Sequence, residues 1–555
     1  MENQLETIQI QTDQLVLGHY VIKESGIYRH TEMPSSDGKE TQSELICLTP
    51  MYPTAILENI DTKEQRIELT YAGQNHSESV ILDRETLVNK NKVVGLARYG
   101  IAVGSVNASK VAAFFTTVLG QSSAKLPRKL AKSSLGWVGK KHDYFLPYSD
   151  GFVLDQMDQA VTDLLEAMKP HGDETAWFDR MKQIRHSIPV RIAMAAAFAS
   201  PLIAIVGQNP FVTHIWGGTG LGKTLLLKVT MSIYGNPNST QIVRSLNCTE
   251  NSLMQQASFL QNLPLAGDEL QTIKTRYDNY DKLIMDMTEG VNRGRLGPDA
   301  KQQRVMTWRN AILTCGEEPI VKQDSGGGVF ARVVEIELLQ PYVKDGNELA
   351  NFVADNYGFA GPKYINALML PVALGGYDIK MIYRDMFGKL MRSGKLNEKQ
   401  AGAGALIMAA DWIASSLFWQ GEPELTVEDV SQFLKSAETV DVTERAYKAV
   451  CGMVARYSSY FADDAKEVWG RFDGEDYVYI LKNVLSEQML KMGFDFEACK
   501  KKWDERGYIV KNNVGRFQHF KYVGSHKAYC VLLKLPTDDA TEQNKLTDHN
   551  GELPF

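Results

Sequence analysis

The segment Gly217-Gly-Thr-Gly-Leu-Gly-Lys-Thr224 combines residue types whose spacing suits phosphate chemistry. It satisfies the pattern G-x-x-x-x-G-K-[ST], in which glycines let backbone N–H groups turn toward phosphates. We expect Lys223 to reach the β- and γ-phosphates of ATP, and the Thr224 hydroxyl to hold Mg²⁺. The alternative is a chance match in a glycine-rich loop. The residues expected to bind the nucleotide are Gly217, Gly218, Thr219, Gly220, Leu221, Gly222, Lys223 and Thr224.

A second acidic element follows at residues 263–269, where an apolar segment ends in Asp268 and Glu269. Asp268 is expected to complete the magnesium shell beside Thr224, and Glu269 to polarise the attacking water as the catalytic carboxylate. The alternative is a surface Asp-Glu pair that closes a strand. Between this element and the glycine-rich loop we expect a single helix and strand, and this spacing favours the catalytic interpretation.

Two further positions follow from the charge that builds on the γ-phosphate during transfer. Thr314 ends the next apolar segment and is a candidate sensor of the γ-phosphate; the alternative is a hydroxyl that caps the strand. Arg332 follows three glycines just before the last apolar strand. It is a candidate arginine finger for the ATP of a neighbouring subunit, with a structural salt bridge as the alternative.

These elements must be positioned by a chain of 555 residues with a net charge of -7. That length predicts several domains, and that charge excludes a uniformly basic nucleic-acid binder. The six cysteines are scattered without a CxxC pair, which suits a reducing cytoplasm. The N-terminal residues 1–14 lack a basic region followed by an apolar core, so we expect no signal peptide. The apolar run at residues 192–206 is shorter than a membrane span, so we expect no membrane contact.

The pattern along the chain predicts an α/β protein with five parts. They are an N-terminal α+β domain (1–156), an ATPase core (157–345), a helical lid (346–460), a winged-helix domain (465–536) and a disordered tail (537–555). Strands are expected in the first part at residues 26–30, 44–50, 65–71 and 79–83, with a helix at 107–120. Strands alternating with helices predict a mostly parallel sheet in the core, at residues 201–206, 213–216, 263–266, 309–314 and 333–338.

Local signals refine the second half of the chain. Thr426 and Asp429 form a capping-box-like pair at the start of a lid helix, with Asp429 where Glu or Gln is usual. Helical patterns at residues 477–492 and 496–506, followed by strand patterns at 508–511 and 528–533, indicate a winged helix.

The order of these elements resembles AAA+ P-loop ATPases, and among them the helicases of mobile genetic elements. The motifs match most closely those of the staphylococcal cassette-chromosome helicase group, which is related to the replicative MCM helicases and has phage and pathogenicity-island relatives. The matching segments are Gly26-Ile-Tyr28, Leu135-Gly-Trp137, the glycine-rich loop, Ala266-Gly-Asp-Glu269, Leu313-Thr-Cys-Gly-Glu-Glu318 and Asn356-Tyr-Gly-Phe-Ala-Gly-Pro362. The sensor of MCM-type enzymes is usually Asn, so Thr-Cys-Gly-Glu is a departure that weakens the assignment of Thr314.

The resemblance implies a ring, expected to be a homo-hexamer, that moves along DNA using ATP and Mg²⁺ bound between subunits. In such helicases a hairpin before the sensor strand lines the pore, and here the corresponding residues are Arg293, Arg295, Lys301 and Arg304. A solvated basic loop is the alternative. In the predicted wing, Lys511, Arg516 and Lys521 lie among aromatic residues, a pattern that suits a DNA backbone. A small protein-contact domain is the alternative.

The last residues of the chain, Leu553-Pro-Phe555, follow a polar segment that contains acids. This resembles the acidic tip of bacterial single-stranded-DNA-binding proteins, in which an apolar residue and a free carboxylate dock onto replication proteins. We therefore expect the tail to recruit host replication proteins, with a frayed terminus as the alternative.

The leading interpretation is an ATP-dependent DNA helicase or translocase that acts on single-stranded and forked DNA in the replication of a mobile element. Two alternatives stay open: a DNA-stimulated ATPase that does not unwind, and an origin-binding initiator that uses ATP as an assembly switch. Glu269 disfavours the pure switch, because a switch needs no strong catalytic carboxylate.

Overall fold

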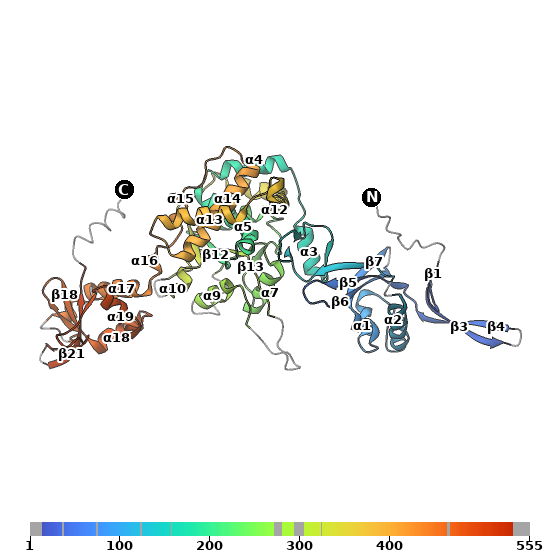
Figure 1. The fold of residues 1–555 in the computed structure, drawn as a ribbon, viewed down its shortest axis with the longest axis horizontal. Helices are drawn as coiled ribbons and strands as arrows, with labels where there is room; N and C mark the ends of the chain where they lie inside the picture. The colour runs from blue at the N-terminus through green and yellow to red at the C-terminus, as the bar shows by residue number, and fades with distance from the viewer. Residues whose placement is uncertain are drawn as a thin grey trace.

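The computed structural model describes residues 14–35, 38–73, 76–122, 125–156, 158–270, 280–293, 305–322, 325–462, 465, 467–524 and 526–536. Figure 1 shows a β-rich N-terminal part, a central part in which helices cover a sheet, and a smaller C-terminal part. Each part has its own main cluster of buried apolar side chains.

The N-terminal part contains two sheets. An antiparallel sheet is formed by β1 (Gln14–Leu17), β2 (Tyr20–Lys23), β3 (Gly26–Ser35) and β4 (Gly38–Cys47). The second sheet has the order β11-β8-β5-β6-β7, with β5 (Met51–Asn59), β6 (Gln65–Ala72), β7 (Ser77–Asp83), β8 (Arg128–Lys132) and β11 (Phe152–Leu154). The strands and the helix predicted here are present, and α2 (Ala108–Ser122) contributes Phe114 and Phe115 to the core together with α1 (Arg84–Val88) and η1 (Val93–Tyr99).

A short hairpin, β9 (Gly136–Val138) and β10 (Tyr144–Leu146), joins the central core although it precedes residue 156. The Trp137 indole donates a hydrogen bond to the Pro201 carbonyl at 2.8 Å, and its backbone N–H donates to Asn262 Oδ1 at 3.0 Å. The Leu135 N–H donates to the Phe259 carbonyl at 2.8 Å. The Leu135-Gly-Trp137 motif therefore anchors the N-terminal part to the central one.

The central sheet is parallel throughout and has the order β13-β14-β15-β12-β16. Its strands are β12 (Phe211–Gly217), β13 (Val243–Ser245), β14 (Leu265–Asp268), β15 (Ala311–Gly316) and β16 (Val333–Leu338). Helices α6 (Lys223–Met231), α7 (Glu250–Leu260), α9 (Asp281–Glu289) and α10 (Gly327–Phe330) connect or flank the strands. Four of the five predicted strands are present, and β13 was missed because it has only three residues.

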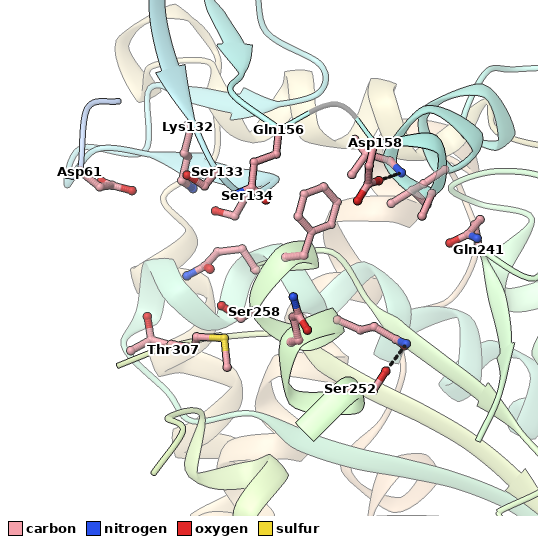
Figure 2. Close-up of a pocket in the computed structure, with 18 of the residues that line it drawn as sticks. Asp61, Lys132, Ser133, Ser134, Gln156, Asp158, Gln241, Ser252, Ser258 and Thr307 are labelled. Carbon is pink, nitrogen blue, oxygen red and sulfur yellow. Dashed lines mark hydrogen bonds between the residues drawn. The ribbon is translucent and has the colours of Figure 1, made fainter. Parts of the chain in front are cut away.

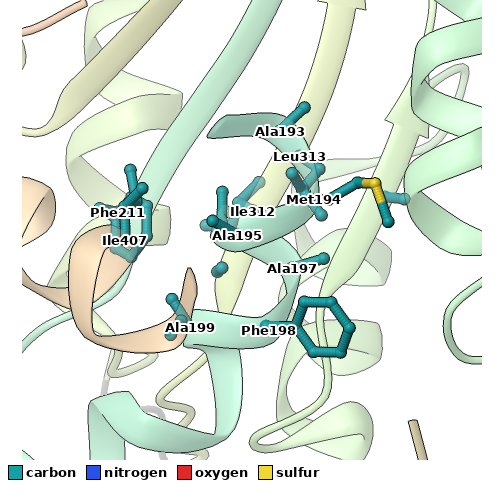
Figure 3. Close-up of a cluster of buried hydrophobic side chains, with 14 of the residues drawn as sticks. Ala193, Met194, Ala195, Ala197, Phe198, Ala199, Phe211, Ile312, Leu313 and Ile407 are labelled. Carbon is teal, nitrogen blue, oxygen red and sulfur yellow. The ribbon is translucent and has the colours of Figure 1, made fainter. Parts of the chain in front are cut away.

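The strand predicted at residues 201–206 is wrong: α5 (Ile188–Val206) is one continuous helix with Pro201 inside it. Proline removes a backbone donor, so the carbonyl of Ala197, four residues earlier, loses its helical partner. The Tyr234 hydroxyl lies 3.3 Å from that carbonyl and donates to it. Tertiary packing thus compensates for the proline. Figure 3 shows α5 packed against Phe211, Ile312 and Leu313 of the sheet and Ile407 of α14 (Glu398–Phe418).

A buried ion cluster ties α5 to α14. The Arg191 guanidinium donates to both oxygens of Asp411, at 2.9 and 2.5 Å for the nearest pairs. Arg185, which ends α4 (Glu174–Ile184), lies 3.1 Å from Asp411 and 3.0 Å from Glu422. Arg185 also stacks 3.9 Å over the Trp419 ring. Two cations and two carboxylates balance each other where water is largely excluded.

The remaining helices of the central part are α3 (Gln159–Ala167), α11 (Gly346–Asp355), α12 (Ala360–Met369), η2 (Val372–Leu374), α13 (Ile379–Arg392), α15 (Val427–Ser431) and α16 (Ala437–Val440). Among them, α12, α13 and α15 contact α5 or α14. The predicted capping box is confirmed: Thr426 Oγ1 accepts from the Asp429 N–H, and the Asp429 carboxylate accepts from the Thr426 N–H.

The C-terminal core begins at α17 (Val442–Arg456), earlier than the sequence pattern suggested, because Tyr447, Val450 and Met453 face it. It continues through η3 (Ser458–Phe461), β17 (Gly470–Asp473), β18 (Tyr477–Leu481), α18 (Lys482–Lys491), α19 (Phe496–Glu505), β19 (Ile509–Val510), β20 (His519–Val523) and β21 (His526–Lys534). The helix predicted from residue 477 is wrong over its first five residues. These alternate Tyr, Val, Tyr, Ile and Leu and form β18 beside β21.

Two described helices, α5 and α14, are long and apolar enough to cross a membrane, but 78% and 72% of their most apolar windows are buried inside the structure. Both form the central core, so their apolar composition is explained by packing.

Removing the Asp411 carboxylate should destabilise the central part, because Arg185 and Arg191 would remain buried without it. We expect Asp411→Ala to lower the free energy of unfolding by about 3–5 kcal/mol. Urea denaturation followed by tryptophan fluorescence measures this. The matched control is Asp385→Ala on α13, whose pair with Lys389 is 57% exposed at the carboxylate and should change stability by less than about 0.5 kcal/mol. Equal effects of the two substitutions would contradict the proposed role of the cluster.

Candidate functional site

The glycine-rich loop connects the end of β12 to the start of α6. Gly217 has φ 148°, and a Cβ there would lie 2.6 Å from the Leu338 carbonyl oxygen, so no side chain fits. Gly222 is the N-cap of α6 with φ 87°, a left-handed conformation that glycine adopts without strain. The loop therefore lies at a helix N-terminus, where unpaired N–H groups favour an anion.

Lys223 and Thr224, the last two residues of the loop, form the start of α6. The Lys223 ammonium is exposed to the cavity and donates to the Gly218 carbonyl at 2.7 Å. Thr224 Oγ1 donates to Asp268 Oδ1 at 3.2 Å. The structure thus joins the hydroxyl and the carboxylate expected to share a divalent cation, although 44 residues separate them in the chain.

Asp268 ends β14, and Glu269 follows with φ 56°. A left-handed conformation is uncommon for a residue with a side chain, and such strain is found preferentially at functional sites. The Glu269 N–H donates to Asp268 Oδ1 at 2.9 Å, which fixes the turn. Both carboxylates line the same cavity as Lys223 and Thr224.

The expected sensor Thr314 lies elsewhere. Its hydroxyl is 2.9 Å from His214 Nδ1, and the other ring nitrogen of His214 is 2.9 Å from the Glu318 carbonyl. Burial lowers the pKa of His214 to about 4, so the ring is neutral near pH 7. The geometry does not support Thr314 as a phosphate sensor, because side chains of successive strand residues point to opposite faces and Thr314 does not line the cavity.

The same strand instead brings Cys315 and Glu317 to the cavity, and the sequence analysis missed both. The Cys315 thiol donates to Asp268 Oδ1 at 2.7 Å. The Thr219 hydroxyl of the glycine-rich loop donates to Glu317 Oε1 at 3.0 Å. Strand alternation was the available signal, since it places residue 315 opposite residue 314.

The complete cavity has a volume of about 260 Å³. It is lined by Thr219, Gly220, Gly222, Lys223, Thr224, Leu225, Asp268, Glu269, Cys315, Gly316 and Glu317. Tyr342 packs against the back of the loop, with its hydroxyl 3.4 Å from the Gly222 carbonyl. One ammonium, two hydroxyls and three carboxylates at the N-terminus of a helix suit a polyphosphate with a hard divalent cation.

Arg332 does not line this cavity of its own chain. Its guanidinium donates to the Gly328 carbonyl at 3.0 Å and lies 3.6 Å from Glu289 Oε2, and its side chain is 12% exposed. In the single chain Arg332 therefore forms the salt bridge that was the structural alternative. Arg332 could contact a nucleotide only if that nucleotide were bound to a neighbouring chain.

Of the residues expected to bind DNA in a pore, only Arg293 is described. It is exposed and pairs with Asp286 at 2.9 Å. Arg295, Lys301 and Arg304 lie outside the described residues, as does the tail with Leu553, Pro554 and Phe555.

The three wing candidates lie on or beside the C-terminal sheet. Lys511 pairs with Asp504, Lys521 lies 5.3 Å from the Tyr479 ring centroid, and the exposed Arg516 side chain has no hydrogen bond or ion pair with a described residue. The exposed aromatic residues Phe520, Tyr522 and Tyr529 lie on β20 and β21. The sheet thus presents basic and aromatic side chains together.

Comparisons with known proteins agree with this organisation. The family described as "Domain of unknown function (DUF927)" matches residues 20–305, and the family described as "Cch helix turn helix domain" matches residues 441–538. A solved structure described as "SCCmec type IV Cch - active helicase" superposes with a TM-score of 0.69 at 16% sequence identity, over 95% of this chain and 99% of that chain. No curated protein sequence matches.

The class of protein is therefore a mixed α/β protein with the fold of this helicase structure and a helix-turn-helix domain at its C-terminal end. The match to the family described as DUF927 covers residues 20–305, more than half of this chain. The chain therefore belongs to that family. The resemblance to cassette-chromosome helicases that the motifs predicted is confirmed.

The position of Cys315 predicts an unreactive thiol. Burial raises the pKa of Cys315 to about 12, and the bond to Asp268 adds to the shift. The thiolate is the reactive form, so at about pH 8 only roughly one thiol in ten thousand is ionised. We expect iodoacetamide to alkylate Cys315 at least about tenfold more slowly than the half-buried Cys248, as measured by peptide mass spectrometry. In urea the two rates should converge. Equal rates in the folded protein would contradict the placement of Cys315 against Asp268.

Proposed function

We propose that this protein is an ATP-dependent DNA helicase or translocase of the AAA+ type that replicates a mobile genetic element. One observation carries the proposal. Lys223, Thr224, Asp268 and Glu269 converge on one cavity at the carboxyl edge of a parallel sheet, in a chain with the fold of a structure described as an active helicase. Under this proposal the helices around α14 act as the lid, and the C-terminal part acts as a winged helix.

The cavity fits ATP and Mg²⁺ by its donor set. The loop N–H groups and Lys223 would hold the phosphates, and Thr224 and Asp268 would hold the cation, which supplies charge neutralisation on the phosphate oxygens when bound. Glu269 would orient the attacking water and accept its proton. To do so, Lys223 must leave the Gly218 carbonyl and Asp268 must exchange the Cys315 thiol for the cation.

Cys315 and Glu317 take over the place that the sequence analysis gave to Thr314. The Cys315 thiol is protonated and holds the Asp268 carboxylate in position. Glu317 accepts a hydrogen bond from Thr219 of the glycine-rich loop, so a movement of the loop would change this contact. A carboxylate here would repel phosphate, and we propose that Glu317 moves when a nucleotide binds.

Arg332 is proposed to serve the ATP of the next subunit in a homo-hexameric ring. Its pair with Glu289 is 55% exposed on the carboxylate side, so exchange for a phosphate costs little. Hydrogen bonds from Gln400 position the backbone on both sides of Arg332. The Gln400 amide donates to the carbonyls of Phe330 at 2.6 Å and Val333 at 2.9 Å, on either side of Arg332. A buried lid residue thus positions the proposed finger.

DNA is proposed to contact two regions. Arg293, Arg295, Lys301 and Arg304 would line the pore, while Lys511, Arg516 and Lys521 would meet the duplex backbone at the wing. Exposed aromatic residues beside these cations support the second region, because stacking and phosphate contacts work together on nucleic acid. The helix-turn-helix match over residues 441–538 supports it as well.

The tail and the cellular setting complete the proposal. Phe555 with its free carboxylate would dock onto a host replication protein, so that the element recruits the host machinery in the cytoplasm. The alternatives remain a DNA-stimulated ATPase that does not unwind and an ATP-switched initiator. The strained Glu269 beside Asp268 favours hydrolysis over a pure switch.

Unwinding of a forked duplex tests the proposal. Lys223→Ala should abolish ATP binding because it removes the cation that faces the phosphates. Glu269→Gln should bind ATP but lower turnover about a hundredfold or more, with unwinding lost in parallel. The matched control is Glu337→Gln, an exposed position on β16 that does not line the cavity. Unchanged turnover in Glu269→Gln would remove Glu269 from the reaction, and ATP hydrolysis without unwinding would favour the non-unwinding alternative.

Mixed rings test whether Arg332 acts between subunits. Neither Arg332→Ala nor Lys223→Ala should hydrolyse ATP alone, but a mixture should regain part of the activity, because some interfaces then combine an intact loop with an intact finger. Mixing Lys223→Ala with Glu269→Gln is the control. Each of these substitutions damages the nucleotide cavity of the chain that carries it. Every interface in the mixed ring therefore contains a defective cavity, and activity should not return. If mass photometry shows mixed rings and no ratio of Arg332→Ala to Lys223→Ala restores hydrolysis, Arg332 is not a finger in trans.

A further inference from the structure

A second, larger cavity lies between the N-terminal part and the central part, and no function above uses it. Its volume is about 490 Å³, within the range of small-ligand sites. Figure 2 shows Ser133, Ser134, Gln156 and Asp158 on one side of the cavity and Ser252, Ser258 and Thr307 on the other. None of its lining residues belongs to the cavity beside the glycine-rich loop.

The lining is polar without being strongly charged overall. Glutamine amides dominate the lining contributed by α7 and its neighbours, where Gln255, Gln256 and Gln261 present both donors and acceptors. Phe259 adds a partly exposed aromatic ring. Amides that read donor and acceptor groups, next to a ring that can stack, are the groups that recognise a nucleobase.

Arg244 supplies the charge that a phosphate needs. It lies on β13, lines the cavity and is partly buried, and its side chain has no hydrogen bond or ion pair with any residue that the structure describes. Burial lowers the pKa of Arg244, which reflects the cost of holding this cation away from water. A partly buried cation that has no carboxylate partner among the described residues is a place where a ligand anion gains favourable interaction energy.

Two other charged groups around the cavity, Lys132 and Asp158, have structural roles of their own. The Lys132 ammonium donates to the carbonyls of Leu135 at 3.1 Å and Trp137 at 2.7 Å. Asp158 caps α3 by accepting from the Val161 N–H at 2.9 Å. Asp61 also lines the cavity and would repel a phosphate on its own side. The anion should therefore bind at Arg244, on the side formed by β13 and α7.

We propose that this cavity is a second nucleotide-binding site, in which Arg244 holds a phosphate and the amides and ring of α7 hold the attached base. The ligand is either a free nucleotide or one nucleotide of a DNA single strand, since the two share this chemistry. The site is separate from the ATP cavity and does not depend on hydrolysis.

The site is also connected to the ATP cavity by one strand pair. Arg244 pairs with Gly267 and Ser245 pairs with Asp268 where β13 runs beside β14. A ligand that pulls on Arg244 therefore acts on the strand that carries Asp268. Occupancy of the cavity should therefore change the rate of ATP hydrolysis. The cavity would then act as a sensor of nucleotide or DNA beside β13, the edge strand of the central sheet.

Photo-crosslinking to the full chain without ATP tests the proposal. The probes are 4-thio-dTMP and a dT oligomer that carries 4-thiothymidine, and mass spectrometry identifies the crosslinked peptide. We expect crosslinks within residues 250–261. Arg244→Gln should weaken the probe that binds there about tenfold, as loss of a charge-assisted bond predicts. For the oligomer it should also make the salt dependence shallower by about 0.7 in log–log slope.

Three variants make the outcome decisive. Gln255→Glu places a negative charge at an exposed position of the cavity, and it should weaken binding even if Arg244→Gln folds poorly. Arg384→Gln is the matched control, since Arg384 is exposed on α13 and does not line the cavity. Lys223→Ala should leave the crosslink intact, which separates this site from the ATP cavity whatever the fate of the proposed helicase activity.

Each result has one meaning. Crosslinking by 4-thio-dTMP alone identifies a free-nucleotide site, and crosslinking by the oligomer identifies a strand site; both support the proposal when Arg244→Gln or Gln255→Glu reduces them. Crosslinks confined to other peptides, or crosslinks within residues 250–261 that neither variant weakens, would overturn it.

Discussion

The candidate site depends on one constraint, the parallel pairing of β12 between β15 and β16. Phe211 to Trp216 pair with Ala311 to Gly316 in unbroken register, and β14 pairs with β15 on the other side. Because parallel strands end at the same edge, this register brings the glycine-rich loop, Asp268 and Glu317 together. It also decides which side chain of β15 faces the nucleotide cavity. A shift of one residue would exchange Cys315 for Thr314.

The helices α5 and α14, which pack in the core beside the sheet, stabilise this register. α5 lies against the sheet strands with Pro201 in its interior, and Tyr234 and Trp137 bond to the carbonyls of Ala197 and Pro201. The ion cluster at Asp411 holds α5 to α14. From α14, Gln400 reaches the segment that carries Arg332. One continuous set of buried contacts therefore links the N-terminal hairpin, the sheet and the proposed finger.

The sequence predicted those parts of the site whose chemistry is local. The glycine-rich loop and the Asp268-Glu269 pair are short motifs at strand ends, so residue type and spacing were sufficient to locate them. The face of a strand is not a local property, and Thr314 was predicted as the sensor because nothing near it in the chain indicates its partner, His214, which lies 100 residues away. Pro201 made the sequence pattern look like the end of a helix. The helix continues because Tyr234, which is distant in the sequence, donates a hydrogen bond to the carbonyl that the proline leaves without a helical partner. The second cavity joins β8, β13 and α7, which no short motif relates.

In the proposed function, ATP and magnesium bind at the end of β12 with Thr224 and Asp268 on the cation. The decisive measurement is a structure of the protein with a non-hydrolysable ATP analogue and Mg²⁺. We expect phosphates surrounded by the loop from Gly217 to Thr224, Lys223 moved from the Gly218 carbonyl to the phosphates, and Asp268 moved from Cys315 to the cation or its water. Nucleotide bound elsewhere, or an Asp268–Cys315 contact unchanged beside a bound cation, would contradict it.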